Sequence, residues 1–227
     1  MRSKLIPLLV LGGVAACDTA TGVTGTTNEP AVRIVNAFTS PVDVIIDGNV
    51  AISAMAAGSV GTALTSPGDH TLLLRPTGTG TAISQSITAA TGAMSTIAAT
   101  RDASTGALSS SVLDDTGSVV PAGATKLRVI HLAPNAGTLQ VYRTQPDFAT
   151  PTSWQFPFNY QPNPDALSAP FYQSTVGTWE VRIWQTPADP SGWSTATVKV
   201  VVPLASGEKK TIIILDKPGG GVSTQVL

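Results

Sequence analysis

Two short motifs in this chain of 227 residues contain residue types that carry out hydrolysis in other proteins. Residues 115–118 read DTGS, the loop sequence of aspartic proteases, whose mechanism needs two such aspartates sharing one proton. The motif occurs once, and Asp-Thr-Gly is also common turn chemistry. Residues 57–61 read AGSVG, the spacing of a nucleophile elbow, which leads from a strand into a helix. Strand-like sequence on both sides predicts a glycine bulge or turn there instead.

The two histidines are the remaining candidates for proton transfer or metal binding. His70 follows a turn and is expected to contact solvent, whereas His131 lies in an apolar strand and is expected to bond a neighbouring loop backbone. Zinc needs three or four ligands, and neither histidine has companions at ligand spacing. Asp114 and Asp115 lack the alternating oxygen ligands of a calcium loop. We therefore predict no metal site and no cofactor.

Aromatic residues give the strongest indication of a binding surface. Eleven of the twelve Phe, Trp and Tyr residues follow residue 125, and the exception is Phe38. In an extended chain, residues at i and i+2 share a face, so four rings within 154–160 fall on one face. Prolines within 157–170 keep this segment out of a central strand. The candidate ligand-binding residues are Trp154, Phe156, Phe158, Tyr160, Phe171 and Tyr172.

Two interpretations of this aromatic stretch, residues 154–172, are open. An exposed row of rings beside a rigid loop can bind a sugar ring, a peptide or a partner domain. A row at this spacing also fits the interior of a β-sandwich, where it faces the core. The first interpretation predicts a binding surface, and the second leaves the stretch with a purely structural role.

The first 17 residues, MRSKLIPLLVLGGVAAC, have the pattern of an export signal. Arg2 and Lys4 form a basic start, and the apolar run 5–14 is too short to span a bilayer permanently. The last four residues, VAAC, resemble the lipobox of bacterial lipoproteins. That resemblance implies a signal peptide over 1–16 and a lipid on Cys17, which becomes the mature N-terminus. The alternative is a plain signal peptide followed by an incidental thiol.

Charge and composition narrow the range of partners. Loss of Arg2 and Lys4 with the signal peptide leaves 11 of the 13 basic residues against 14 acidic ones, a net charge of −3. The sequence has no basic run, which argues against nucleic acid as a partner. Charged residues make up only 12% of the chain, as in exported β proteins with Thr-, Ser- and Gly-rich surfaces. The expected partners are a membrane, reached through the N-terminal lipid anchor, and an envelope protein or polysaccharide.

After residue 30 the sequence is β throughout, because short runs rich in Val, Ile, Leu and Thr alternate with turn clusters. The run AVRIVN at 31–36 matches KLRVIH at 126–131, and MSTIAATRD at 94–102 matches KKTIIILDK at 209–217. Two copies of a unit with about seven strands predict tandem sandwiches. The expected divisions are a lipidated cysteine and tether at 17–30, a first sandwich at 31–113, a linker at 114–125 and a second sandwich at 126–227.

The first strand, the proline turn and the VDVIIDG run that follow residue 30 resemble the DUF4397 family. The first copy keeps Asp43 and the Asp47–Gly48 turn but has Asn36 where histidine is common in the family. The second copy keeps His131 but has Gln140 where the aspartate falls. The resemblance implies an exported bacterial β-sandwich domain that often occurs in tandem, and it implies no particular chemistry.

We therefore expect an all-β protein, with two tandem immunoglobulin-like antiparallel β-sandwiches after a signal peptide and a flexible tether. The expected function is non-enzymatic. We expect an exported, lipid-anchored protein of the cell envelope, on its periplasmic or surface face, that acts as a binding or spacer module through residues 154–172. The alternative is a hydrolase acting on envelope polymers or polysaccharide. That alternative requires a pair of acids, or a nucleophile and a histidine, converging in one cleft.

Overall fold

The computed structural model describes residues 29–78, 80–102, 104–113, 119–146, 156–158, 171–185 and 196–227. The expected signal peptide at 1–16 and the lipidated Cys17 lie outside the described residues. The DTGS motif at 115–118 also lies outside them, as do Trp154 and Tyr160 of the aromatic stretch.

The first eight strands form two four-stranded sheets that pack face to face as a sandwich. The sheet orders are β4-β1-β7-β8 and β3-β2-β5-β6. Alternation along the strands places apolar side chains inside, as in β5, where Leu72 and Leu74 are buried and Thr71 is exposed. The strands are β1 (Ala31–Asn36), β2 (Val42–Ile46), β3 (Asn49–Met55), β4 (Val60–Leu64), β5 (Gly68–Pro76), β6 (Ile83–Ala89), β7 (Met94–Arg101) and β8 (Leu108–Leu113).

The next eight strands repeat the same arrangement, with the orders β12-β9-β15-β16 and β11-β10-β13-β14. The register is also the same, because Ala31 pairs with Met94 in the first sandwich and Lys126 with Lys209 in the second. One short 3-10 helix, η1 (Pro134–Ala136), interrupts the strands. No helix in the described ranges has the length and apolar character needed to cross a membrane. The strands are β9 (Ala124–Leu132), β10 (Leu139–Thr144), β11 (Phe156–Phe158), β12 (Tyr172–Thr175), β13 (Gly177–Gln185), β14 (Val198–Leu204), β15 (Lys209–Asp216) and β16 (Val222–Val226).

The predicted all-β class is confirmed, but one pair of strands in each sandwich differs from the antiparallel expectation. Strand β1 runs parallel to β7, and β9 runs parallel to β15. The other described strand pairs are antiparallel. The apolar alternation in the sequence specifies which face a residue occupies, and it carries no information about the direction of the neighbouring strand.

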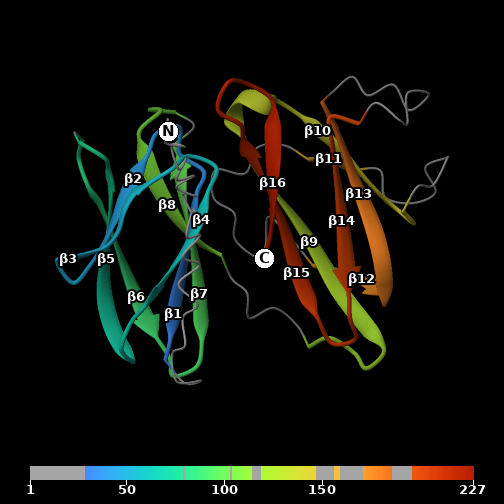
Figure 1. Ribbon diagram of the computed structural model, residues 1–227, viewed down its shortest axis with the longest axis horizontal. Coiled ribbons are helices and arrows are strands. Elements are labelled where there is room, and N and C mark those ends of the chain that lie inside the picture. The colour runs from blue at the N-terminus through green and yellow to red at the C-terminus, as the bar shows by residue number, and fades with distance from the viewer. Residues whose placement is uncertain are drawn as a thin grey trace, which may run out of the picture.

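Each sandwich has an apolar core of its own, and a third apolar cluster lies between the two sandwiches. The sheets that contain β1 and β9 face each other there (Figure 1). Both faces of these inner sheets are therefore covered, which explains why all nine residues of β9 are buried. The residues of this third core are Val35, Ala37, Ala98 and Leu113 from the first sandwich and Ile130, Leu132, Ile213 and Leu215 from the second.

A two-residue turn joins β2 to β3 and is fixed by a histidine. Asp47 and Gly48 have φ values of 49° and 81°, as a type I′ hairpin turn requires. One carboxylate oxygen of Asp47 accepts a hydrogen bond from the backbone N–H of Thr71 at 2.9 Å. The other oxygen lies 2.6 Å from Nδ1 of His70. The turn is thereby tied to β5, the neighbour of β2 in the sheet.

The expectation that His70 contacts solvent is wrong, because its side chain is only 8% exposed. Its Nε2 lies 2.8 Å from the carbonyl oxygen of Ser66, so both ring nitrogens face acceptors. The imidazolium form can donate to both, and the bond to Asp47 followed by the Ser66 carbonyl raises the pKa of His70. The same bond from His70 lowers the pKa of Asp47. The pair is a structural support for the turn.

Replacing His70 should make the hairpin less sensitive to pH. The stabilisation from His70 is complete below its ordinary pKa of 6.5 and is lost as the pH rises through the raised value. The stabilisation from Asp47 is complete above 3.8 and is lost as the pH falls through the lowered value. The difference in melting temperature between the wild type and His70→Gln should therefore be largest near pH 5 and shrink by pH 9. A difference that does not change over this range would contradict the assignment, and Lys199→Gln should follow the wild-type profile.

Truncating the third core should cost as much stability as truncating either sandwich core. Ile213 is fully buried between the sandwiches, so Ile213→Ala removes apolar contacts and leaves a cavity. We expect the free energy of unfolding to fall by about 2–5 kcal/mol in urea titrations. Val201→Ala, at a side chain that is 54% exposed, should change it by less than about 0.5 kcal/mol. Equal small losses in both variants would show that the sandwiches do not rely on each other.

Candidate functional site

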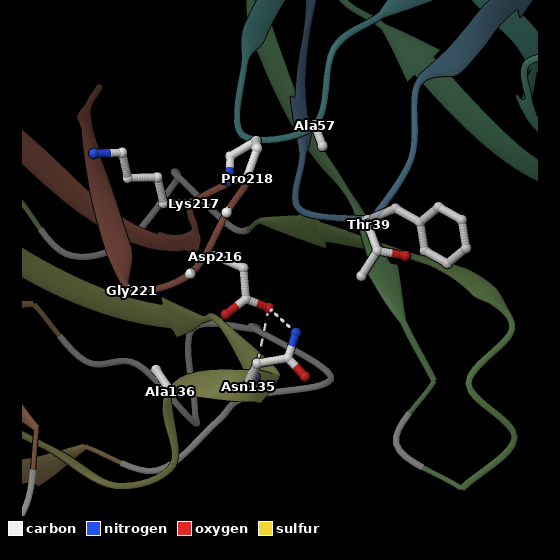
Figure 2. Close-up of a pocket in the computed structure, with 11 residues that line it drawn as sticks. Thr39, Ala57, Asn135, Ala136, Asp216, Lys217, Pro218 and Gly221 are labelled. Carbon is white, nitrogen blue, oxygen red and sulfur yellow. Dashed lines mark hydrogen bonds between the residues drawn. The ribbon is translucent and has the colours of Figure 1, made fainter.

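A cavity of about 430 Å³ opens between the two sandwiches, at the end of the interface where β1 and β15 finish. Figure 2 shows Thr39 of the first sandwich facing Asn135 and Asp216 of the second, with Ala57 at the same opening. The loop Lys217–Gly221 forms the remaining wall, and the Lys217 side chain points away from the other labelled groups. We refer to this cavity as the junction cleft.

The loop after β15 turns back sharply because it consists of Lys-Pro-Gly-Gly-Gly. Gly219, Gly220 and Gly221 all have positive φ values, between 79° and 107°, which other residues rarely adopt. The N–H of Lys217 donates to the carbonyl oxygen of Gly221 at 3.0 Å, and that of Gly220 donates to Lys217 at 2.9 Å. This closed loop leaves Asp216, the last residue of β15, at the wall of the junction cleft.

Asp216 is the group with the most unusual environment in the cleft. Its Oδ2 accepts hydrogen bonds from Asn135, from the side-chain Nδ2 at 2.9 Å and from the backbone N–H at 3.4 Å. Its Oδ1 is shielded from solvent and has no hydrogen-bond partner among the residues that the structure describes. Burial raises the pKa of Asp216 above 3.8, while the bonds from Asn135 and the positive charge of Arg101 act in the opposite direction. The carboxyl group therefore has spare hydrogen-bonding capacity.

Asn36 shapes the loop that supplies Phe38 and Thr39 to the junction cleft. Its Nδ2 donates to the carbonyl oxygens of Ser40 at 3.1 Å and Met55 at 2.8 Å. Its Oδ1 accepts from the backbone N–H of Phe38 at 3.0 Å. The Asn36 side chain is completely buried, so its partners are all protein backbone groups.

His131 shapes the loop that supplies Asn135 to the junction cleft, as Asn36 shapes the loop on the other side. Its Nε2–H donates to the carbonyl oxygen of Gly137 at 2.7 Å, and its Nδ1 accepts from the N–H of Ala133 at 3.2 Å. This pattern requires the neutral ring, and burial lowers the pKa of His131 below 6.5. The expected bond between His131 and a neighbouring loop backbone is confirmed. Asn36 and His131, matched in the sequence, thus play equivalent parts on the two sides of the cleft.

The AGSVG motif at 57–61 forms a turn and the first residues of a strand, as expected, and it does not present a nucleophile. The Ser59 hydroxyl donates to the carbonyl oxygen of Ala56 at 2.6 Å, and Gly58 has a φ of 76°. The Gln225 side chain donates to the carbonyl oxygen of Gly58 at 3.2 Å. The turn therefore contacts the second sandwich beside the junction cleft. Within the described ranges, no group of three or more His, Cys, Asp or Glu residues could hold a metal ion.

The described members of the aromatic stretch lie on two different sheets. Phe156 and Phe158 belong to the edge strand β11, opposite Val141 and Leu139, which are both core residues. This edge position agrees with the constraint expected from Pro157, which lies between them. The other two described members belong to the inner sheet or adjoin it. Tyr172 begins the edge strand β12, and Phe171 directly precedes Tyr172.

Phe171 and Tyr172 are both half-buried, and neither lines the junction cleft. The guanidinium carbon of Arg128 lies 4.2 Å from the centre of the Phe171 ring, and the Lys209 amine lies 5.9 Å from it. These distances fit cation–π contacts. Phe171 and Tyr172 therefore do not contribute to the junction cleft, while Trp154 and Tyr160 lie outside the described residues and the proposal of an aromatic binding surface stays a prediction.

Asp216 and Asn135 were missed by the sequence analysis, although the sequence contains a signal for Asp216. The match between residues 94–102 and 209–217 aligns Arg101 with Asp216, so charge reverses between equivalent positions. The Gly-Gly-Gly run that follows has no counterpart after Arg101. Such a local departure from an otherwise similar pattern marks a position whose surroundings differ between the two units. Asn135 carries no such signal, because its role depends on the fold of η1.

Two solved structures are similar to the chain over most of its length. One is the product complex of SpuA, a multi-modular glycogen-degrading pneumococcal virulence factor, at 8% identity and a TM-score of 0.28. That match covers 86% of this chain, which spans only 22% of the other protein. The second is a streptococcal virulence factor described as binding alpha-glucan, at 8% identity and a TM-score of 0.25, with 81% of this chain and 92% of the other covered. No curated protein matches the chain.

A family model described as "Domain of unknown function (DUF4397)" matches residues 30–142. The matched stretch contains all eight strands of the first sandwich, together with β9 and most of β10 of the second. It thus includes Asn36 and His131, the two residues that shape the loops of the junction cleft, and strands from both sides of the third core. The resemblance seen in the sequence is confirmed, and through residues 30–142 the chain belongs to the DUF4397 family.

Proposed function

We propose that this chain is a non-enzymatic lipoprotein of the cell envelope, and that it binds its ligand in the junction cleft. The observation that carries the proposal is the buried Oδ1 of Asp216, which has no hydrogen-bond partner among the described residues. An unsatisfied buried oxygen costs free energy, and a ligand that donates a hydrogen bond to it recovers that cost. Nearby, Thr39 and Asn135 add a hydroxyl and an amide to the same cavity.

The ligand that best suits these groups is a neutral, hydroxyl-rich molecule such as a segment of envelope polysaccharide. A hydroxyl both donates and accepts, so it can serve Asp216 and Thr39 at once. The raised pKa of Asp216 reflects surroundings that disfavour the charged carboxylate. Because the neutral form is favoured, a neutral ligand suits this group better than a cationic one. A few polar groups that converge in a cavity of this volume are typical of a small-molecule or glycan site.

The alternative, a hydrolase acting on envelope polymers, lacks a supporting arrangement in the described part of the chain. Among the described residues, Asp216 is the only carboxylate that lines the junction cleft, and glycoside hydrolysis ordinarily uses two. The hydroxyl of Ser59 bonds a backbone carbonyl, and the two imidazoles are committed to Asp47 and Gly137. A binding role needs only the groups that the cleft already presents.

Removing the Asp216 carboxylate should weaken glycan binding. Isothermal titration of a panel of neutral α- and β-linked glucose oligosaccharides against the wild type identifies the best ligand. Asp216→Ala should bind it about ten- to a hundredfold more weakly, as the loss of a bond to a carboxyl group predicts. Asp69→Ala, a surface aspartate outside the cleft, is the matched control and should bind normally.

Two results would contradict this assignment. If Phe171→Ala abolished binding while Asp216→Ala did not, the aromatic stretch would be the site. Release of reducing ends from the oligosaccharides by pure protein, absent in Asp216→Ala, would identify a hydrolase instead.

The lipid anchor predicts how the protein partitions between detergent and water. Protein made in a bacterial host should enter the detergent phase of a Triton X-114 extraction, because acyl chains on Cys17 carry it there. Cys17→Ser should move it to the aqueous phase, and mass spectrometry of the wild-type N-terminus should show the added acyl groups. Wild-type protein that stays in the aqueous phase would rule out the anchor and would leave the binding site unaffected.

A further inference from the structure

His131 holds both ends of η1, the short helix that carries Asn135 into the junction cleft. Ala133 precedes this helix and Gly137 follows it. The N–H of Ala133 donates to Nδ1 of His131 at 3.2 Å, and Nε2–H of His131 donates to the carbonyl oxygen of Gly137 at 2.7 Å. The carbonyl oxygen of Ala133 also accepts, at 3.1 Å, the bond from Ala136 that closes the helix. The position of η1 therefore depends on one completely buried imidazole.

The position of η1 in turn decides how the Asp216 carboxyl group lies in the cleft. Asn135 is the middle residue of η1, and it donates to Oδ2 of Asp216 from its side chain at 2.9 Å and from its backbone N–H at 3.4 Å. Figure 2 shows both bonds running from Asn135 to the same carboxyl group. They occupy Oδ2 and leave Oδ1 for the ligand. A displacement of η1 would therefore disturb the group that we propose to bind it.

Protonation of His131 is incompatible with this arrangement. Nδ1 accepts the bond from Ala133 through its lone pair, and the imidazolium ion carries a hydrogen on both ring nitrogens. Two N–H groups would then face each other across the 3.2 Å that separates these atoms. A buried donor that loses its acceptor is destabilising, so Ala133 and the start of η1 must move. The bond to Gly137 can persist, because Nε2 keeps its hydrogen.

The surroundings of the ring act on its protonation in opposite directions. Burial disfavours the imidazolium and lowers the pKa of His131 below 6.5, although the bond to Gly137 and the negative charge of Asp216 on β15 act against this. Arg101, from β7 of the first sandwich, offsets part of that negative charge. The Lys217 side chain points away, and η1 has no ionisable side chain. The ring is therefore neutral above 6.5 and takes up a proton only as the pH falls below that value.

The first sandwich shows what the same position does without a titratable group. Asn36 is matched to His131 in the sequence, and its Oδ1 accepts from the N–H of Phe38, two residues further on, at 3.0 Å. Ala133 stands at the same spacing from His131. An amide keeps its acceptor oxygen at any pH at which His131 titrates, so the loop after Asn36 has no such response. The two sides of the junction cleft thus differ in one respect, the sensitivity of their support to protons.

We propose that His131 is a positioning residue of the junction cleft, and that uptake of a proton at its Nδ1 releases the bound glycan as the pH falls. This inference rests on the proposed function and adds its regulation. The proton comes from solvent and removes the bond from Ala133, after which Asn135 no longer holds the Asp216 carboxyl group in its binding orientation. His131 does not line the cleft, so it acts on the ligand through η1.

Isothermal titrations from about pH 8 to about pH 5, with the glucose oligosaccharide selected above, test this regulation. In the wild type, Kd should be constant at the alkaline end and should rise about tenfold per pH unit below the pKa of His131, as uptake of one proton requires. His131→Asn places the amide of the first sandwich at this position and should abolish the rise. His131→Gln is a second variant with a longer amide. Each variant is compared with itself across the pH range, so a change in its Kd at pH 8 does not affect the test.

His70→Gln is the matched control and should keep the wild-type slope, because His70 lies beside the β2–β3 turn and outside the described lining of the cleft. A rise in Kd of wild-type size in both His131→Asn and His131→Gln would assign the pH dependence to Asp216 and overturn the role of His131. A wild-type Kd that stays constant while His131 titrates would overturn it as well.

NMR spectra of the ligand-free protein make the result independent of the proposed function. The chain has two histidines, so the imidazole signal that remains in His70→Gln belongs to His131. The backbone amide signal of Ala133 and the side-chain amide signal of Asn135 should titrate with the same midpoint as this ring. Coupled titration without any oligosaccharide binding would retain the positioning role and overturn the glycan as the ligand. Amide signals that do not follow the ring, or loss of the whole dispersed spectrum at that midpoint, would overturn the positioning role itself.

Discussion

The apolar contact between the two inner sheets is the constraint on which the rest of this structure depends. It covers the second face of each inner sheet and converts two sandwiches into a stack of four layers. It also brings loops from separate parts of the chain to common ends of the stack. The junction cleft lies at one end of this contact, and a second cavity, also lined by residues of both sandwiches, lies at the other end.

The two ends differ in charge because equivalent positions carry different residues. Arg33 and Arg128 are matched between the sandwiches, and both lie near Phe171: Arg33 lines a cavity together with it, and Arg128 stacks on its ring. At the other end, Arg101 in the first sandwich is matched by Asp216 in the second. Backbone geometry is therefore shared, while the chemistry at each end is set by a few side chains. Asn36 and His131 also occupy equivalent positions with different side chains. The amide and the imidazole each donate a hydrogen bond to a backbone carbonyl oxygen and accept one from a backbone N–H group.

The sequence was sufficient for the β class, the turn at Asp47–Gly48 and the bond of His131 to its loop, because each depends on local pattern or composition. It was insufficient for the parallel pairing of β1 with β7, since alternation does not encode strand direction. It also could not locate Asp216 in a cleft, because that cleft is formed by two sheets whose mutual contact has no local signature. The burial of the His70 side chain cannot be predicted from local sequence, because its partner, Asp47, is 23 residues distant along the chain.

The equivalence of Arg101 and Asp216 has a consequence for how such an interface can exist at all. In a symmetric pair of identical subunits, a residue close to the two-fold axis meets its own copy, so a charge there always meets the same charge. Within one chain the two positions vary independently, and here the positive charge of Arg101 opposes the rise that burial causes in the pKa of Asp216. Covalent linkage of the two sandwiches thus allows opposite charges at equivalent positions, which two identical subunits cannot have.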